Sequence, residues 1–185
     1  MTILWLNWRD IKNPKAGGAE VMMHETAKRL AGGGHQITII SSYFPGAKKL
    51  EIADGIKIIR QGNSFTCRFW AFLKYKKEFE GKIDLVIDGI NTIPFFTNFY
   101  VKEKKTALIH QLAKEYWWSE IFFPLNLIGY LLEPLYLKTY RNIPTIAASN
   151  STKKDLTRLG FGKVFVFHQG LSTNPLSRLP QKSDP

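Results

Sequence analysis

Short apolar runs alternate with longer amphipathic stretches along most of the chain. Runs of four to six residues rich in Ile, Leu and Val are typical of strands covered on both faces of a sheet. The predicted strands are Ile3–Leu6, Gln36–Ser41, Ile56–Arg60, Ile83–Asp88, Thr106–His110, Thr145–Ala148 and Val164–Phe167. The predicted helices are Ala19–Ala31, Phe69–Glu80, a long stretch over Tyr116–Arg141 that its prolines should break, and Ser151–Leu159.

This alternation predicts the fold class. Strand–helix–strand units make right-handed crossovers, and a series of them builds a mainly parallel sheet with helices on both faces. We therefore expect an α/β, doubly wound, Rossmann-like domain over residues 1–171. Ligands of such sheets bind at the carboxyl ends of the strands, so the segments that follow strands are the first places to search for a site.

Length, charge and cysteine content narrow the possible functions. The 185 residues suffice for one domain, and the proline-containing tail over 172–185 is interpreted as a linker toward a missing C-terminal domain. The net charge of +11 favours anionic partners, namely nucleic acid, an anionic membrane surface or phosphorylated ligands. The single cysteine, Cys67, cannot form an internal disulfide and fits a reducing cytoplasm.

The first candidate site is Gly17-Gly18-Ala19-Glu20, which follows the first strand and opens the first helix. Two glycines allow a ligand to approach the backbone closely, and the amides at a helix N-terminus favour phosphate. The alternative is a loop that merely leads into a helix, with Glu20 complementing the helix dipole. The pattern alone favours neither.

The second candidate is His110, which closes a predicted strand and so lies at the expected ligand edge. An imidazole there could contact a sugar hydroxyl or a phosphate, and its charge is tunable near neutral pH. The alternative is a histidine whose ring bonds a backbone carbonyl. Asn91, which follows the strand Ile83–Asp88, is a further residue at this edge.

Aromatic residues gather after His110. We assign Tyr116, Trp117 and Trp118 to an acceptor site, because aromatic faces stack on sugar rings and also favour membrane interfaces. The later aromatic residues are better explained as core, because a helix that is apolar nearly all round is usually buried. The segment Ile121–Leu137 is too short and too interrupted to span a bilayer, which leaves a buried or interfacial helix.

Two other segments have plain structural explanations. Asn150 or Ser151 is expected to cap the helix Ser151–Leu159, although this cap also lies at the cleft edge. His24-Glu25 starts a zinc-protease-like string, but residue 28 is Lys, so we interpret His24 as a helix-surface residue and expect no metal site.

Several segments together resemble the N-terminal domain of GT-B-fold glycosyltransferases of the family-4 type. The Gly17–Glu20 segment resembles that family's glycine-rich acceptor loop. The other matching segments are Asp84–Asp88 with Asn91–Phe96, Ala107–Ala113 with its strand ending in His, Ser149–Leu156 as a Ser-x-Ser-Thr helix start, and Phe167–Leu171. The match covers roughly residues 1–171. It departs from the family at Asn150, where Glu is frequent, and at His168-Gln169, where Asn is more usual.

The resemblance implies an enzyme that moves a sugar from a nucleotide-diphosphate sugar, usually with retention and without a metal or other cofactor. The acceptor would be lipid-linked or a surface-polysaccharide precursor. His110 would then contact the transferred sugar, and the Gly17–Glu20 loop would contact the donor diphosphate or an acceptor phosphate. The family also has a second domain that binds the donor through an E-x7-E motif. Glu115 and Glu120 have the wrong spacing for it, so we expect the chain alone to be inactive.

A second class of function stays open, namely a standalone binding module. Such a module would recruit a lipid-linked or phosphorylated sugar, or would recruit a separate subunit that carries the donor domain. Nucleic-acid binding rests on charge alone, because no recognition helix or zinc spacing supports it. The charge together with the aromatic, apolar segment after His110 predicts a cytoplasmic protein that sits peripherally on the inner face of the plasma membrane.

Overall fold

The computed structural model describes residues 1–113, 117 and 123–168. Its strands are β1 (Thr2–Leu6), β2 (Gln36–Ser41), β3 (Leu50–Ala53), β4 (Ile56–Arg60), β5 (Leu85–Ile90), β6 (Lys104–Ile109), β7 (Thr145–Ala147) and β8 (Val164–Val166). Its helices are α1 (Gly18–Gly32), α2 (Cys67–Lys74), which continues as the π-helical turn η1 (Tyr75–Phe79), α3 (Thr97–Tyr100), α5 (Leu125–Lys138) and α6 (Asn150–Arg158).

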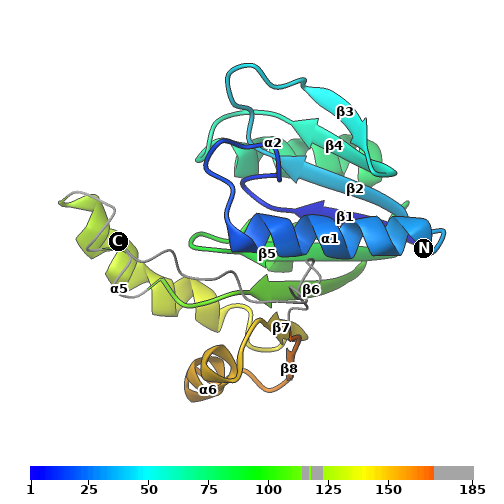
Figure 1. Ribbon diagram of the computed structural model, residues 1–185. Coiled ribbons are helices and arrows are strands. Elements are labelled where there is room, and N and C mark those ends of the chain that lie inside the picture. Colours follow the sequence, from blue (N-terminus) through cyan, green and yellow to red (C-terminus); the bar gives the residue numbers. More distant parts are fainter. Residues whose placement is uncertain (114–116, 118–122, 169–185) are drawn as a thin grey trace, which may run out of the picture.

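The strands form one sheet in the order β3-β4-β2-β1-β5-β6-β7-β8 (Figure 1). Every neighbouring pair is parallel except β3 and β4, which are antiparallel. The order reverses direction around β1, which is the pattern of a doubly wound sheet and places a ligand-binding crevice at that point. The predicted fold class is confirmed.

Two cores lie on the two faces of this sheet, because successive side chains of a strand point to opposite sides. Trp5 of β1 belongs to the core that includes Met23 and Ala27 of α1. Leu4 belongs to the opposite core, which includes Ala71 of α2. Figure 1 shows α1 across one face and α2 behind the other.

The hairpin of β3 and β4 was only half predicted. The Asp54-Gly55 turn was expected to lead into a strand, but β3 was not predicted because its side chains are exposed or half-buried. Asp54 and Gly55 both have positive φ values, 50° and 76°, as a tight two-residue hairpin turn requires.

His24 is not the surface residue that we expected. It is 8% exposed, and its Nε2 lies 2.8 Å from a carboxylate oxygen of Asp54. The hairpin turn that carries Asp54 therefore reaches α1 and covers this histidine, a contact between two elements that neither segment's sequence reveals.

Two expectations about the later part of the chain were also wrong. Pro134 does not break the helix but lies inside α5. The cap of α6 is Ser149, whose Oγ accepts the Thr152 N–H at 3.1 Å, rather than Asn150 or Ser151. Core was expected for most of the later aromatic residues, and the outcome is mixed: Tyr140 is fully buried, whereas Phe123 is 76% exposed.

Candidate functional site

A cavity of about 320 Å³ opens where β1, β5 and β6 end. Its walls come from the segments that follow these three strands and from the start of α1. It is lined by Trp8, Arg9, Gly18, Ala19, Asn91, Thr92, His110, Gln111 and Ala113. The structure thus brings together four of the residues that the sequence predicted at this edge, namely Gly18, Ala19, Asn91 and His110.

The glycine loop presents open backbone to this cavity. A Cβ added at Gly18 would meet no atom within 4 Å, and one added at Gly17 would lie 3.8 Å from Oε2 of Glu20. No protein atom therefore lies closer than 3.8 Å to either added Cβ. The first amides of a helix have no acceptor within the helix, so they suit an anionic or hydroxyl-rich ligand.

Glu20 does more than complement the helix dipole. Its side chain is fully buried, and its Oε2 accepts the Gly17 N–H at 2.7 Å. Its Oε1 lies 3.4 Å from Nε of Arg9 and 3.4 Å from Nδ2 of Asn91. One carboxylate therefore fixes the glycine loop, a cavity arginine and a cavity asparagine relative to one another.

Sequence reasoning missed Trp8 and Arg9. The Arg9 guanidinium lies 4.2 Å from the centre of the Trp8 ring, and its Nη1 donates to the Lys15 carbonyl at 2.5 Å. Both residues lie within three positions of the end of β1, so the strand-end rule that selected His110 could have selected them. Arg9 adds a cation to a wall that otherwise carries amides and an imidazole, which suits phosphate recognition.

His110 lines the cavity just beyond β6. Its backbone carbonyl accepts the Thr152 hydroxyl at 2.8 Å, which joins this strand end to α6. Burial lowers the pKa of the His110 imidazole below its usual value, and the nearby Glu20 carboxylate offsets part of that effect. The ring is therefore neutral near pH 7, so it has one donor nitrogen and one acceptor nitrogen.

The other predicted site residues lie away from the cavity wall or beyond the described residues. Asn150 is exposed, and Ser151 bonds Ser149 through their hydroxyls at 2.8 Å. Neither residue lines the cavity. Tyr116 and Trp118 lie outside the described residues, as does the predicted linker over 172–185.

Trp117 is buried rather than displayed to a ligand. It is 4% exposed, and its indole N–H donates to Oε2 of Glu133 at 3.1 Å. The other oxygen of Glu133 accepts the Ala113 N–H at 2.6 Å. Trp117 and Glu133 thus connect α5 to the chain segment that leaves the cavity, and a part for Trp117 in acceptor binding stays a prediction.

A buried ion pair anchors the loop between β1 and α1. The side chains of Asp10 and Arg60 are each at most 1% exposed. The Arg60 guanidinium donates two hydrogen bonds to the Asp10 carboxylate, at 2.7 and 2.8 Å. Burial alone would raise the pKa of Asp10, but hydrogen bonds from Arg60 and Ser41 hold it below its ordinary value. The anchored loop carries Arg9 and leads into Gly17.

A second buried carboxylate holds the segment after β5. Asp88 is fully buried and accepts hydrogen bonds from the Tyr140 hydroxyl at 2.6 Å and from the Thr97 hydroxyl at 2.8 Å. The Phe95 N–H also donates to it, at 3.1 Å. Burial raises the pKa of Asp88, and these donors offset part of the rise. These bonds span the turn that carries Asn91.

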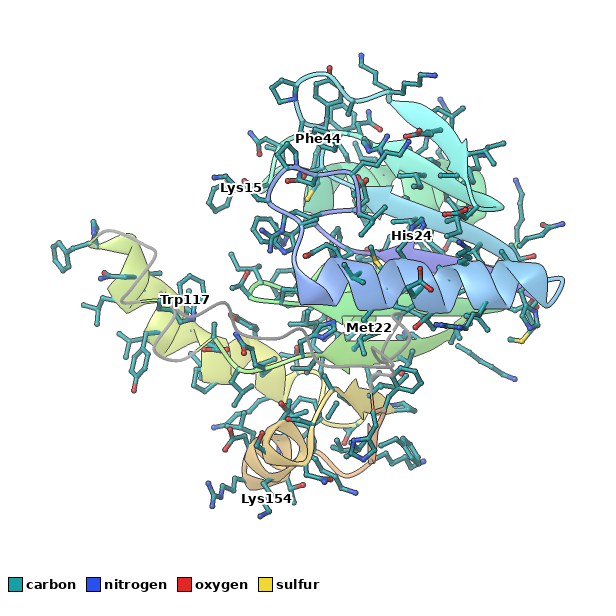
Figure 2. The ribbon with its side chains drawn as sticks, in the orientation of Figure 1. Lys15, Met22, His24, Phe44, Trp117 and Lys154 are labelled. Carbon is teal, nitrogen blue, oxygen red and sulfur yellow. The ribbon has the colours of Figure 1, made fainter. Side chains whose placement is uncertain are left out.

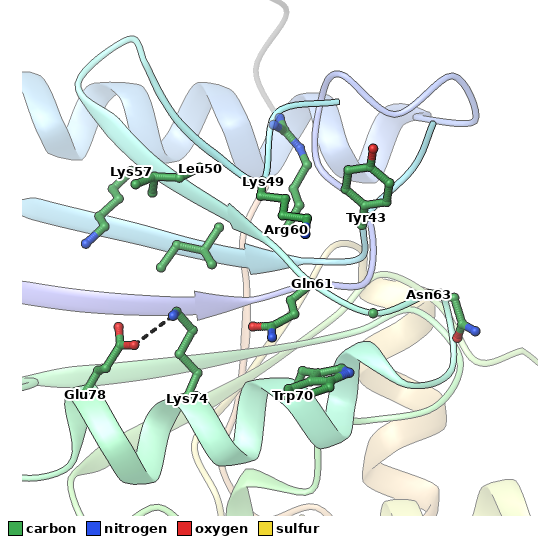
Figure 3. Close-up of a pocket in the computed structure, with 12 residues that line it drawn as sticks. Tyr43, Lys49, Leu50, Lys57, Arg60, Gln61, Asn63, Trp70, Lys74 and Glu78 are labelled. Atoms are coloured by element: carbon green, nitrogen blue, oxygen red, sulfur yellow. Dashed lines mark hydrogen bonds and ion pairs between the residues drawn. The ribbon is translucent and has the colours of Figure 1, made fainter. Parts of the chain in front are cut away.

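A larger cavity, of about 640 Å³, lies between β4 and α2 (Figure 3). Its walls include Tyr43, Trp70 and three lysines, one of which, Lys74, pairs with Glu78 at 2.8 Å. It contains neither the glycine loop nor His110, so the smaller cavity is the better candidate site. Within the described part of the chain, no group of three or more His, Cys, Asp or Glu residues could hold a metal ion.

Comparison with solved structures supports the fold. Sucrose-phosphate synthase from Thermosynechococcus elongatus superposes with a TM-score of 0.62 at 12% sequence identity. The match covers 90% of this chain and 47% of that one, so this chain spans about half of the synthase's length. The fold is thus a Rossmann-like α/β domain that matches about half of a GT-B-fold protein. A search of curated protein sequences finds no significant match.

Comparison with sequence models of protein families identifies the family of this chain. Residues 16–174 match the model described as Glycosyltransferase Family 4, and this range contains Gly17, Gly18, Asn91 and His110. It runs from the glycine loop through α6 and β8, which is most of the chain. The chain therefore belongs to glycosyltransferase family 4.

Proposed function

We propose that this chain is the acceptor-side domain of an enzyme that moves a sugar from a nucleotide-diphosphate sugar to an acceptor. The acceptor is lipid-linked or a precursor of a surface polysaccharide, and the enzyme works on the cytoplasmic face of the membrane. Transfer retains the anomeric configuration and needs no metal. The isolated domain transfers no sugar, because a second domain holds the donor.

One observation carries this proposal, the convergence of Gly18, Arg9 and His110 on one cavity at the point where the sheet order reverses. Amides at the start of α1 and the Arg9 guanidinium suit a phosphate group. A neutral imidazole can donate to, or accept from, a sugar hydroxyl. Glu20 holds the Gly17 backbone and the Arg9 guanidinium in place, so little rearrangement of these two groups is needed when a ligand binds.

The glycine loop gives a direct test in the protein encoded by the complete reading frame, assayed with a panel of nucleotide sugars. Gly17→Val and Gly18→Val should each place a side chain in the open space beside the loop. We expect turnover to fall by about 10²-fold or more, as when one polar stabiliser is lost. The melting temperature should change little, because neither added Cβ meets an atom closer than 3.8 Å.

Gly162→Val is the matched control, since Gly162 also has no atom within 4 Å of an added Cβ but lies outside the cavity. Its turnover should equal that of the unmodified protein. Full activity in both loop variants would reduce the loop to a spacer. Turnover by the 185-residue chain alone would contradict the proposed division of labour between two domains.

A further inference from the structure

Helix α5 buries polar side chains against the rest of the protein and exposes aliphatic side chains to solvent. Its buried positions recur every three or four residues at Asn126, Gly129, Glu133 and Leu137. Two of these four are polar, and both are less than 8% exposed. The opposite face carries Leu127, Ile128, Leu131, Leu132 and Leu135, which are 37–59% exposed. A helix that packs on a core normally shows the opposite pattern.

The buried face has partners within the chain that explain its polar residues. Glu133 accepts hydrogen bonds from Trp117 and from the Ala113 backbone. An added Cβ at Gly129 would lie 2.3 Å from the Trp117 ring, so the ring rests directly on the helix backbone there. Figure 2 shows Trp117 beside α5, and Figure 1 shows this helix extending away from the sheet.

The exposed face is aliphatic and free of charge. From Leu127 to Leu135 it extends about 12 Å at the usual rise of a helix. The only charged side chain between these two positions is Glu133, which points inward. Tyr130, at 45% exposure, adds an amphipathic ring at the edge of the face. A contiguous apolar surface of this kind marks an interaction site.

Positive charge flanks this face at the C-terminal end of α5. Lys138 and Arg141 are exposed there. Helix α6 shares a core with the same end of α5, because Leu137, Tyr140 and Leu156 belong to one buried cluster. The outer side of α6 exposes Lys153 and Lys154, and Figure 2 shows Lys154 pointing away from the protein.

We propose that α5 is a membrane-docking helix that lies in the plane of an anionic bilayer, with its leucine face in the headgroup–acyl boundary. This inference rests on the proposed function only in that a lipid-linked acceptor makes such docking useful. An apolar face beside a basic flank is the arrangement that binds anionic lipid surfaces. None of the helices in the described residues is long and apolar enough to cross a bilayer.

Charge also argues against a second copy as the occupant. Another copy would bring the same +11 charge and the same basic flank to the interface. An anionic bilayer instead supplies the opposite charge, and each basic residue near it contributes on the order of 1 kcal/mol. The lipid surface is therefore the occupant to which the charges are complementary.

Vesicle flotation tests the proposal with the protein from the complete reading frame. The unmodified protein should bind vesicles of phosphatidylcholine with phosphatidylglycerol, bind phosphatidylcholine alone at least tenfold more weakly, and lose binding as salt rises. The double variant Leu131→Glu, Leu135→Glu should bind the anionic vesicles at least about tenfold more weakly, since two apolar side chains are lost from the contact. Both leucines are more than half exposed, so the fold should persist.

The double variant Leu50→Glu, Ile52→Glu is the matched control. These residues are 59% and 77% exposed on β3, at the opposite edge of the sheet, and should not affect vesicle binding. Equal loss in both variants would show that added negative charge alone prevents binding and would overturn the docking face. Equal binding to neutral and anionic vesicles, or no binding, would also overturn it.

A fluorescent label gives a second readout that does not depend on affinity. In the 185-residue chain the single native thiol, Cys67, is buried, so a thiol introduced there by Leu131→Cys can be labelled selectively with an environment-sensitive dye. Its emission should shift to shorter wavelength with anionic vesicles, and the same dye at Ile52→Cys should not respond. A shift at residue 131 that depends on protein concentration and needs no vesicles would mean that a second copy covers the face, and would overturn the proposal.

The docking proposal and the proposed function can fail separately. In the Leu131→Glu, Leu135→Glu variant, turnover with a water-soluble acceptor analogue should match that of the unmodified protein, because α5 contributes no residue to the cavity wall. Loss of vesicle binding with retained turnover supports docking as a separate property. Absence of turnover in every form of the protein refutes the glycosyltransferase proposal without changing the meaning of the flotation result.

Discussion

The carboxyl edge of the sheet and helix α5 both depart from the usual distribution of polar and apolar side chains, in opposite directions. The edge buries three carboxylates, those of Asp10, Glu20 and Asp88. Helix α5 exposes a row of leucines and isoleucine while it buries Glu133 and Asn126. The first region takes charges out of water, and the second leaves apolar surface in it.

The two regions differ in whether other described residues offset the cost of the unusual burial or exposure. Each carboxylate at the sheet edge has donors that offset the cost of burial, such as Arg60 for Asp10 and Tyr140 for Asp88. The leucine face of α5 has no such compensation among the described residues. The comparison therefore suggests that buried charge organises a site inside the protein, whereas exposed apolar surface points to a partner outside it.

The largest effect is expected from breaking the Asp10–Arg60 pair. Arg60→Met leaves the Asp10 carboxylate buried with one hydroxyl and one backbone donor, and should cost about 3–5 kcal/mol of unfolding free energy. Urea denaturation of the chain measures this loss. Lys49→Met removes a nearby exposed charge as a control and should change stability little. A small loss in Arg60→Met would mean that buried charge at this edge is not what holds the loop.

The next effect concerns catalysis at the same edge. His110→Ala should lower turnover of the complete enzyme by about 10²-fold, which is typical when one polar stabiliser is removed. The side chain lines the cavity, so its removal should leave the melting temperature nearly unchanged. An unchanged rate would assign His110 a packing role only. The assay with nucleotide sugars that tests the glycine-loop variants also measures His110→Ala.

The sheet was predictable because its central strands are buried on both faces. Strands such as β2, with five buried residues in six, show continuous apolar runs that signal their own positions. β3 was missed because it is an edge strand with exposed and half-buried residues. The contact between His24 and Asp54 could not be predicted, since it depends on how the β3–β4 hairpin folds back over α1.

The candidate site was predictable as a place, but its supporting contacts were not. The strand-end rule placed Gly18, Asn91 and His110 at one edge, and they line one cavity. It gave no indication that Glu20 would be fully buried and would bind Gly17. The sequence of α5 is apolar on nearly every side, so its pattern could not show which face the rest of the chain would cover.

A smaller effect is expected at the point where α5 meets Trp117. Gly129→Ala would put a Cβ 2.3 Å from the ring, so the ring must shift, which disturbs its bond to Glu133. Overpacking of this kind should cost about 1–3 kcal/mol. The control Gly32→Ala, in α1 with no atom within 4 Å, should be neutral or slightly stabilising in the same urea titration. A stabilised Gly129→Ala would show that the buried face of α5 is loosely packed, and would weaken the contrast between the two regions.

The smallest effect is a dependence of stability on pH that comes from His110. Burial lowers the pKa of its imidazole below the usual value near 6.5, so the unfolded chain binds a proton before the folded chain does as the pH falls. The unfolded state then holds more protons in the window just below pH 6.5, and stability must decrease as the solution is acidified through that window. The Glu20 carboxylate partly opposes the shift, which keeps the effect small.

His110→Gln removes the titrating imidazole, so urea titrations at pH 7.5 and 5.5 should show a smaller loss of stability in the variant than in the unmodified chain. All other titrating groups are common to both proteins, and taking the difference between them isolates the histidine. If the two proteins lose equal stability, the His110 ring is not desolvated in the folded state, and the sheet edge buries its carboxylates without also burying the imidazole beside Glu20.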